Sequence, residues 1–348
     1  MRRDLGLLPT TVVGSYPQPD HLIDRNALEK VPRVRQPAVW KVPPADLAAA
    51  QDEATIAAIT DQEQAGITVV TDGEIRRESY SNHFANALAG IDERSGTVTI
   101  TNDGRTLEVQ VPDFSSEVRR LAPVEVDNAR FLKAHTDRVT KMTLPGPFTM
   151  AQQAVTSFYP SKRELALALA DAVRDEVVDL FAEGIDIVQL DEPWMQRFPD
   201  DARAYGVEVI NRALEGVSGT VALHICFGYA ATVSTKPSHY TFLAELEDTP
   251  LDHVSIEAAQ PRLDVSSLAG ILPSKRIAVG VLDLSDPEVE SPETVAERVT
   301  RVLQAIEPER LMVAPDCGMK FLPRETALGK LRALALGTEI VRQRVTGS

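Results

Sequence analysis

The sequence has few basic residues and few cysteines for its length. Lysine and arginine number 36 against 51 aspartates and glutamates, which gives a formal net charge of −15. No block of basic residues stands out, so binding to nucleic acid or to an anionic membrane is disfavoured, because both require a basic surface. The 2 cysteines in 348 residues indicate reduced thiols rather than a disulfide framework.

Long apolar runs are also absent. No stretch approaches the about 18 apolar residues of a membrane-spanning helix. The N-terminus has two arginines, but Pro9 and Thr10 interrupt the apolar core that a signal peptide would need. We therefore expect a cytoplasmic protein. No G-x-G-x-x-G motif follows the first expected strand, which disfavours a dinucleotide-binding fold.

Short apolar runs instead alternate with segments of helical periodicity. Near-continuous apolar runs are typical of strands that are buried on both faces. The eight expected strands lie within residues 10–17, 67–70, 138–144, 185–190, 220–226, 253–257, 276–282 and 310–314. About eight strand–helix units in a chain of this length predict an α/β protein with a single (β/α)8 TIM barrel over residues 1–348. A doubly wound open sheet is the competing topology.

Residues 95–111 interrupt this alternation. Two runs of alternating polar and apolar residues, 97–101 and 107–111, flank the sequence Asn102-Asp103-Gly104-Arg105. An Asp-Gly pair between two such runs is typical of a β-hairpin. We predict a β-hairpin insertion near residues 95–111.

Polar side chains of types that can take part in catalysis or metal binding follow the expected strands. In a (β/α)8 barrel the carboxyl ends of all strands lie on one face, and active sites form there. We therefore expect these side chains to converge on one rim. They are Ser15, Glu74, Asp191, His224, Cys226, Glu257, Asp283 and Cys317.

His224 and Cys226 form the centre of this set. Side chains alternate along a strand, so these two share one face. The other cysteine, Cys317, also follows an apolar run, and Glu257 ends a third run. Imidazole, thiolate and carboxylate groups are zinc ligands. A zinc ion with so much negative charge around it suits activation of a thiol for attack on carbon better than formation of hydroxide. Core packing of the histidine and cysteines is the alternative.

Six motifs, in order, resemble the catalytic domain of cobalamin-independent methionine synthase. They are TVVGSYP at 11–17, DGE at 72–74, LDEP at 190–193, HIC at 224–226, SIE at 255–257 and APDCGMK at 314–320. The resemblance spans residues 10–342 and is to a short, single-barrel form of the family. It implies a zinc-dependent homocysteine S-methyltransferase of methionine biosynthesis. The implied zinc ligands are His224, Cys226, Glu257 and Cys317. The implied homocysteine pocket consists of Val13, Gly14, Ser15, Glu74 and Asp191.

Two parts of the sequence depart from the family pattern. Ser285 stands where the family has a proton-donating histidine, and serine is a poor acid near neutral pH, so Asp286 or water would protonate a leaving group. The folate-stacking tryptophan of the family falls near Gln153 here, and its folate-contacting glutamate falls at Arg197. The methyl donor is therefore expected to be methylcobalamin, a corrinoid protein or a methyl-folate.

Two other hypotheses remain. The first is a zinc-dependent alkyltransferase that acts on a different thiol, as the epoxide-opening coenzyme M transferases do. The second is a zinc-storing or corrinoid-partner protein without catalytic activity.

Overall fold

The computed structural model describes residues 3–25, 39–79, 82–102, 105–230, 233 and 235–347. Its main sheet has seven strands in the order β1-β4-β6-β7-β8-β9-β10, and all neighbours are parallel. Their bounds are β1 Val69–Val70, β4 Val139–Pro145, β6 Ile187–Asp191, β7 Thr220–Ile225, β8 His253–Ile256, β9 Arg276–Leu282 and β10 Leu311–Pro315.

The segment around Thr10 closes this sheet into a barrel. Thr10 forms a parallel bridge with Val313 of β10, and Thr11 forms one with Val69 of β1. Backbone hydrogen bonds join Thr11 N to Val313 O at 2.9 Å and Val69 N to Thr10 O at 3.0 Å. The predicted (β/α)8 barrel is confirmed, with two bridging residues in the place of the first strand.

Alternation of side chains along the strands separates two apolar cores. The outward residues pack with the helices in one large cluster. The inward residues form a separate cluster of Val69, Val139, Ile187, Ala222, Ala278, Met312 and Ala314, with Leu5 packed against it. The barrel interior is therefore filled by side chains, as expected for this fold.

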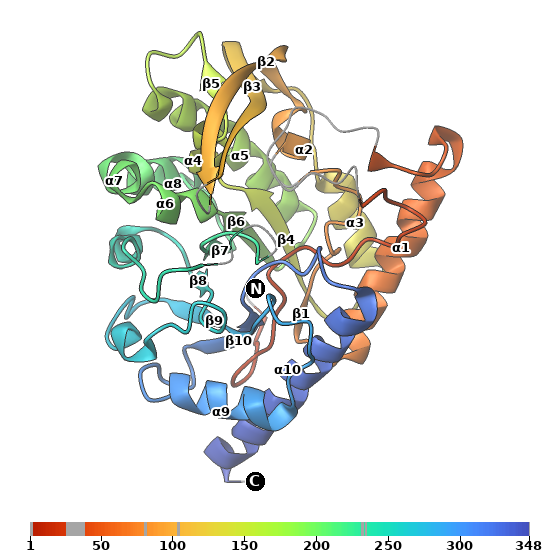
Figure 1. Cartoon of the computed structure of the whole chain (residues 1–348), viewed down its shortest axis with the longest axis vertical. Helices are drawn as coiled ribbons and strands as arrows, with labels where there is room; N and C mark the ends of the chain where they lie inside the picture. The colour runs from red at the N-terminus through yellow and green to blue at the C-terminus, as the bar shows by residue number, and fades with distance from the viewer. Residues whose placement is uncertain are drawn as a thin grey trace.

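The longer helices surround the barrel (Figure 1). They are α1 Pro44–Gln64, α3 Val126–Ala134, α5 Lys162–Ala182, α8 Val207–Ala213, α9 Pro292–Val302 and α10 Arg324–Thr346. The shorter helical segments are α2 Asn82–Ala85, α4 Pro147–Gln152, α6 Pro193–Arg197, α7 Pro199–Asp201, the π-helix η2 Ala202–Gly206 and the 3-10 helices η3 Ala244–Asp248 and η4 Val265–Leu268. Helix α5 begins after Ser161, whose side chain accepts a hydrogen bond from Glu164 N, which is the interaction of an N-cap.

The predicted hairpin is present and is longer than residues 95–111. Strands β2 Leu88–Asn102 and β3 Arg105–Arg120 are antiparallel, and β5 Val155–Thr156 joins them in a three-stranded sheet. The pairing has an irregularity between Ala89 and Ile91, where Gly90 adopts φ +98° and a Cβ would lie 2.7 Å from Glu117 O. Asp103 and Gly104, on which the turn prediction rested, lie outside the described residues.

The hairpin lies at one end of the molecule, opposite the C-terminal end of α10 (Figure 1). It is attached to the barrel layer by Arg120, which pairs with Glu176 at 2.7 Å and with Asp179 at 2.6 Å on α5. Within the described ranges, no helix has both the length and the hydropathy needed to cross a membrane.

Candidate active site

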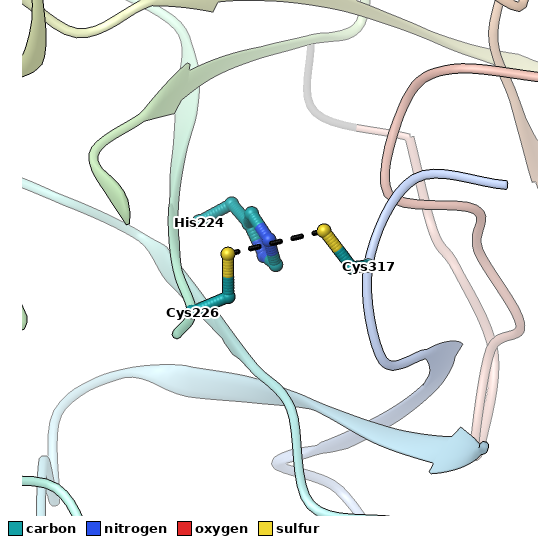
Figure 2. Close-up of side chains that lie close together, drawn as sticks. All are labelled: His224, Cys226 and Cys317. Carbon is teal, nitrogen blue, oxygen red and sulfur yellow. Dashed lines mark hydrogen bonds between the residues drawn. The ribbon is translucent and has the colours of Figure 1, made fainter. Parts of the chain in front are cut away.

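Three of the predicted ligand side chains meet at the carboxyl ends of the strands. His224 belongs to β7, Cys226 follows it directly, and Cys317 follows β10. Potential ligand atoms of the three residues all lie within 4.8 Å of one another, and all three residues are buried. The two Sγ atoms are 3.8 Å apart, and Figure 2 shows them directed toward each other. Both cysteines are free thiols.

The imidazole of His224 has one engaged and one unengaged nitrogen. Its Nδ1 lies 3.1 Å from Ser255 Oγ on β8. Its Nε2 is buried and forms no hydrogen bond within the part of the chain that the structure describes. A buried ring nitrogen without a partner is costly unless something else binds it. This nitrogen and the two sulfurs together are a donor set that suits zinc.

The two thiols have different acidities. A hydrogen bond from Cys226 lowers the pKa of Cys317 well below its ordinary value, and His224 acts in the same direction. The same sulfur–sulfur contact, together with burial, raises the pKa of Cys226. The thiolate form, which is the form that binds metals, is therefore favoured at Cys317.

Glu257 lies after β8 and is fully buried, but its carboxylate has other partners. It accepts a hydrogen bond from Phe227 N, and it pairs with Lys236 Nζ. Lys236 also donates a hydrogen bond to Gly228 O at 2.8 Å. The backbone N–H of Glu257 donates to Tyr240 Oη at 2.9 Å. The group of three that could hold a metal does not include this carboxylate among the described residues.

Asp316 joins the segment of Cys317 to the loop after β8. Its carboxylate accepts hydrogen bonds from the backbone N–H groups of Ala258 at 3.0 Å, Ala259 at 2.9 Å and Gln260 at 2.6 Å. Gly280 of β9 leaves space for it, because a Cβ there would lie 2.3 Å from Asp316 Oδ1. The segments that carry Cys317 and Glu257 are thus held together by one buried carboxylate.

Two further carboxylates, Glu74 and Asp191, lie on the same rim and are each 4% exposed. Glu74 adopts φ +54°, a left-handed conformation that is unusual for a residue other than glycine. Its Oε1 accepts a hydrogen bond from Thr143 Oγ1 at 2.8 Å. Asp191 ends β6, and its Oδ1 accepts a hydrogen bond from Gln189 Nε2 at 2.6 Å.

Asp191 lies beside both the cluster and Glu74. In the register of β6 and β7 it pairs with His224. Burial raises the pKa of Asp191 to about 7, and the negative charge of Glu74 acts in the same direction. The rim therefore joins buried acidic groups to the His-Cys-Cys cluster.

Val13, Gly14 and Ser15 are buried beside these groups. A Cβ on Gly14 would lie 2.4 Å from Glu74 Oε1, so the backbone and the carboxylate are in close contact. A Cβ on Gly318, the residue after Cys317, would lie 2.2 Å from Ser15 Oγ. The structure thus brings the segment 13–15 between Glu74 and the end of β10.

Ser285 and Asp286 lie apart from these buried groups. Both are exposed in the loop after β9. Ser285 Oγ donates to Asp283 Oδ1 at 2.6 Å, and Asp286 Oδ1 accepts from Glu288 N at 2.9 Å. Their side chains are bonded within their own loop, and their role in proton transfer stays a prediction.

The residues that hold the rim side chains in place are missing from the prediction. A signal existed for some of them, because a polar residue at a buried position of a strand requires a partner. Thr143 and Gln189 interrupt apolar strand runs in this way, whereas Lys236 lies in a loop without any periodic pattern. The supporting residues are Arg77, Lys141, Thr143, Gln189, Lys236, Tyr240 and Asp316.

The fold and the rim define a (β/α)8 barrel with a thiol–imidazole cluster beside buried carboxylates. The family model described as cobalamin-independent synthase, catalytic domain, matches residues 8–338. The methionine synthase of Thermococcus kodakarensis is 33% identical over 342 residues, which are 98% of this chain and 95% of that protein. The methionine synthase of Sulfurisphaera tokodaii is 32% identical over 343 residues, 98% of this chain and 94% of that protein.

A solved structure of a methionine synthase is also similar to this chain. The B12-independent methionine synthase from Shewanella sp. W3-18-1, in complex with selenomethionine, is 30% identical, covers 99% of this chain and 100% of its own, and has a TM-score of 0.88. The chain belongs to the family of the cobalamin-independent methionine synthase catalytic domain. It is an enzyme of the methyltransferase class.

Proposed function

We propose that this protein transfers a methyl group to the sulfur of L-homocysteine and so forms methionine. The observation that carries the proposal is the position of Asp191 and Glu74 beside the His-Cys-Cys cluster. Asp191 lies opposite His224 in the register of β6 and β7. Homocysteine has an ammonium group at one end and a thiol at the other. The buried carboxylates bind the ammonium group, and the cluster binds the thiol. The relatives named methionine synthase and the selenomethionine bound by the Shewanella relative support this substrate.

The proposed metal is Zn²⁺, held by His224, Cys226 and Cys317, with Glu257 as the fourth ligand. Bound zinc would lower the pKa of the substrate thiol and leave it nucleophilic. Glu257 forms an ion pair with Lys236. This ion pair must break before Glu257 can bind the zinc ion. A carboxylate is the least tightly held of these ligands on grounds of softness.

The other residues of the site have roles in orientation. Glu74 and Asp191 hold the ammonium group, and Val13, Gly14 and Ser15 contact the carboxylate end through backbone amides. Asp286 is the proposed acid for a leaving group, with Ser285 beside it. These roles follow from the likeness to the family and from the burial of the first five residues.

The methyl donor is either a methyl-folate or a methylated corrinoid. The family description, cobalamin-independent, favours the folate. The residues Gln153 and Arg197, at the positions where the family has its folate contacts, favour the corrinoid. Arg197 here lies over the ring of Trp194, 5.5 Å from its centroid.

One experiment tests activity and donor together. Zinc-replete protein is incubated with homocysteine and, in separate reactions, with methyltetrahydrofolate or methylcobalamin, and methionine is measured by mass spectrometry. We expect methionine with one of the donors and none with the Cys317→Ser variant. Absence of methionine with both donors, in protein that contains one zinc per chain, would overturn the proposal.

A further inference from the structure

The buried carboxylates Glu74 and Asp191 are held in the same manner. Each accepts a hydrogen bond from a neutral side chain, Thr143 or Gln189. Each neutral side chain in turn accepts a hydrogen bond from a buried cation. We call these two chains of contacts the relays.

The first relay runs from Arg77 through Thr143 to Glu74. Arg77 is 1% exposed and donates to Thr143 Oγ1 at 3.0 Å and to Thr143 O at 2.7 Å. A guanidinium group has no acceptor, so the single hydroxyl proton of Thr143 points away from it. That proton is directed to Glu74 Oε1, 2.8 Å away.

The second relay runs from Lys141 through Gln189 to Asp191. Lys141 Nζ donates to Gln189 Oε1 at 2.7 Å. Because the backbone carbonyl of Val13 can only accept a hydrogen bond, the amide nitrogen of Gln189 faces Val13 and its amide oxygen faces Lys141. That nitrogen donates to Asp191 Oδ1 at 2.6 Å and to Val13 O at 2.9 Å.

Arg77 lies closer to the carboxylate of Glu125 than to that of Glu74. Its Nε lies 2.9 Å from Glu125 Oε1, whereas its nearest approach to Glu74 is 3.8 Å. Glu125 is 1% exposed, so this ion pair is fully buried. A close arginine–carboxylate pair at Glu74 would compete with an incoming ammonium group more strongly than the longer contact of 3.8 Å and the threonine hydroxyl do.

We propose that Thr143 and Gln189 are positioning residues that aim Glu74 and Asp191 at the ammonium group of the amino-acid substrate. Arg77 and Lys141 fix the direction of each hydrogen bond from behind. The inference rests on the proposed function, because it takes that ammonium group as the ligand of the two carboxylates. The close approach of Gly14 to Glu74 Oε1, the oxygen that accepts the hydrogen bond from Thr143, further confines the carboxylate.

The test compares Thr143→Val, which keeps the shape and loses the hydroxyl, with Thr143→Ser, which keeps the hydroxyl. Binding of homocysteine, and of the same thiol without its amino group (4-mercaptobutyrate), is measured by calorimetry on zinc-loaded protein. We expect Thr143→Val to weaken the binding of homocysteine about tenfold, because a hydrogen bond to the charged carboxylate of Glu74 is lost. The desamino thiol should bind unchanged, and Thr143→Ser should restore the affinity for homocysteine.

Kinetics and a second variant separate positioning from folding. Thr143→Val should raise KM for homocysteine, with kcat at saturation and zinc content unchanged. Gln189→Met, which removes the second relay, should give the same selective loss. Equal weakening of both thiols in both variants would show a merely structural role and overturn the inference, as would unchanged homocysteine binding. Failure of the wild-type protein to bind homocysteine would instead overturn the proposed function, and the inference with it.

Discussion

The two halves of the rim are held in opposite ways. On the cluster side, the His224 Nε2 atom forms no hydrogen bond among the described residues, and the two sulfurs lie 3.8 Å apart and within 4.8 Å of an imidazole nitrogen. On the carboxylate side, Glu74 and Asp191 each accept a directed hydrogen bond from a side chain that is itself held by a buried cation. The cluster side requires a metal ion to bind its ring nitrogen and sulfurs, whereas the carboxylate side is already oriented for a ligand. A change in one side should therefore alter metal content, and a change in the other should alter substrate selectivity.

The largest expected effect comes from the cluster side. Cys317→Ser removes the sulfur whose thiolate form is most favoured and should reduce bound zinc and lower the rate of methionine formation by more than about 1,000-fold. Metal content is measured by mass spectrometry and rate by methionine produced. The matched control is Ser285→Ala, an exposed position, which should retain zinc. Full zinc content in Cys317→Ser would contradict the assignment of this sulfur as a ligand.

A change on the carboxylate side should leave the metal in place. Glu74→Gln removes one negative charge and should reduce kcat/KM for homocysteine about 100-fold, because a buried charge-assisted contact to the ammonium group is lost. Zinc content should match the wild type. Asp191→Asn provides the parallel variant, and zinc loss in either one would show that the two sides are not independent.

A smaller change tests how closely the carboxylate is confined. A methyl group on Gly14 would lie 2.4 Å from Glu74 Oε1, so Gly14→Ala should displace the carboxylate and raise KM for homocysteine about tenfold. The melting temperature reports whether the barrel is intact. Gly216→Ala is a poor control because that glycine has φ +73°, whereas Glu297→Ala changes an exposed position of α9 and should leave KM unchanged. An unaltered KM in Gly14→Ala would contradict close confinement.

The barrel and the cluster could be predicted because both depend on local patterns. Apolar runs such as 187–190 mark buried strands, and His224, Cys226 and Cys317 follow such runs, so the fold alone brings them to one rim. The hairpin was predicted in kind but not in extent, because its outer register contains irregularities near Gly90 that no alternation reveals.

The supporting contacts could not be predicted because they join residues that are far apart in the sequence and have no common pattern. Arg77 meets Glu125, and Lys236 meets Glu257, only after loops of irregular structure have been placed. Glu257 illustrates the consequence. Its position at a strand end indicated a metal ligand, and only the folded chain reveals Lys236 as its partner.

The smallest expected effect concerns the charges behind the carboxylate side. His83 lies 2.7 Å from Glu78 and 3.8 Å from Glu125, the carboxylate that also pairs with Arg77. Burial opposes the charged imidazole, but the hydrogen bond to Glu78 and the charge of Glu125 outweigh it and raise the pKa of His83. The folded state therefore holds this proton more tightly than the unfolded state does. The resulting stability is fully present below the unfolded pKa of about 6.5 and is lost as the pH rises through the folded pKa.

Scanning fluorimetry of the wild type and His83→Gln across this pH range measures the effect. At low pH the wild type should melt about 1–2 °C above the variant, and the difference should shrink as the pH rises. Arg77, Glu78 and Glu125 are the charged groups that face this histidine, so the same titration in Glu78→Gln should show a weaker pH dependence. A difference that does not change with pH would mean that His83 acts by packing alone. The carboxylate side would then be oriented by Arg77 and Lys141 without help from this third cation.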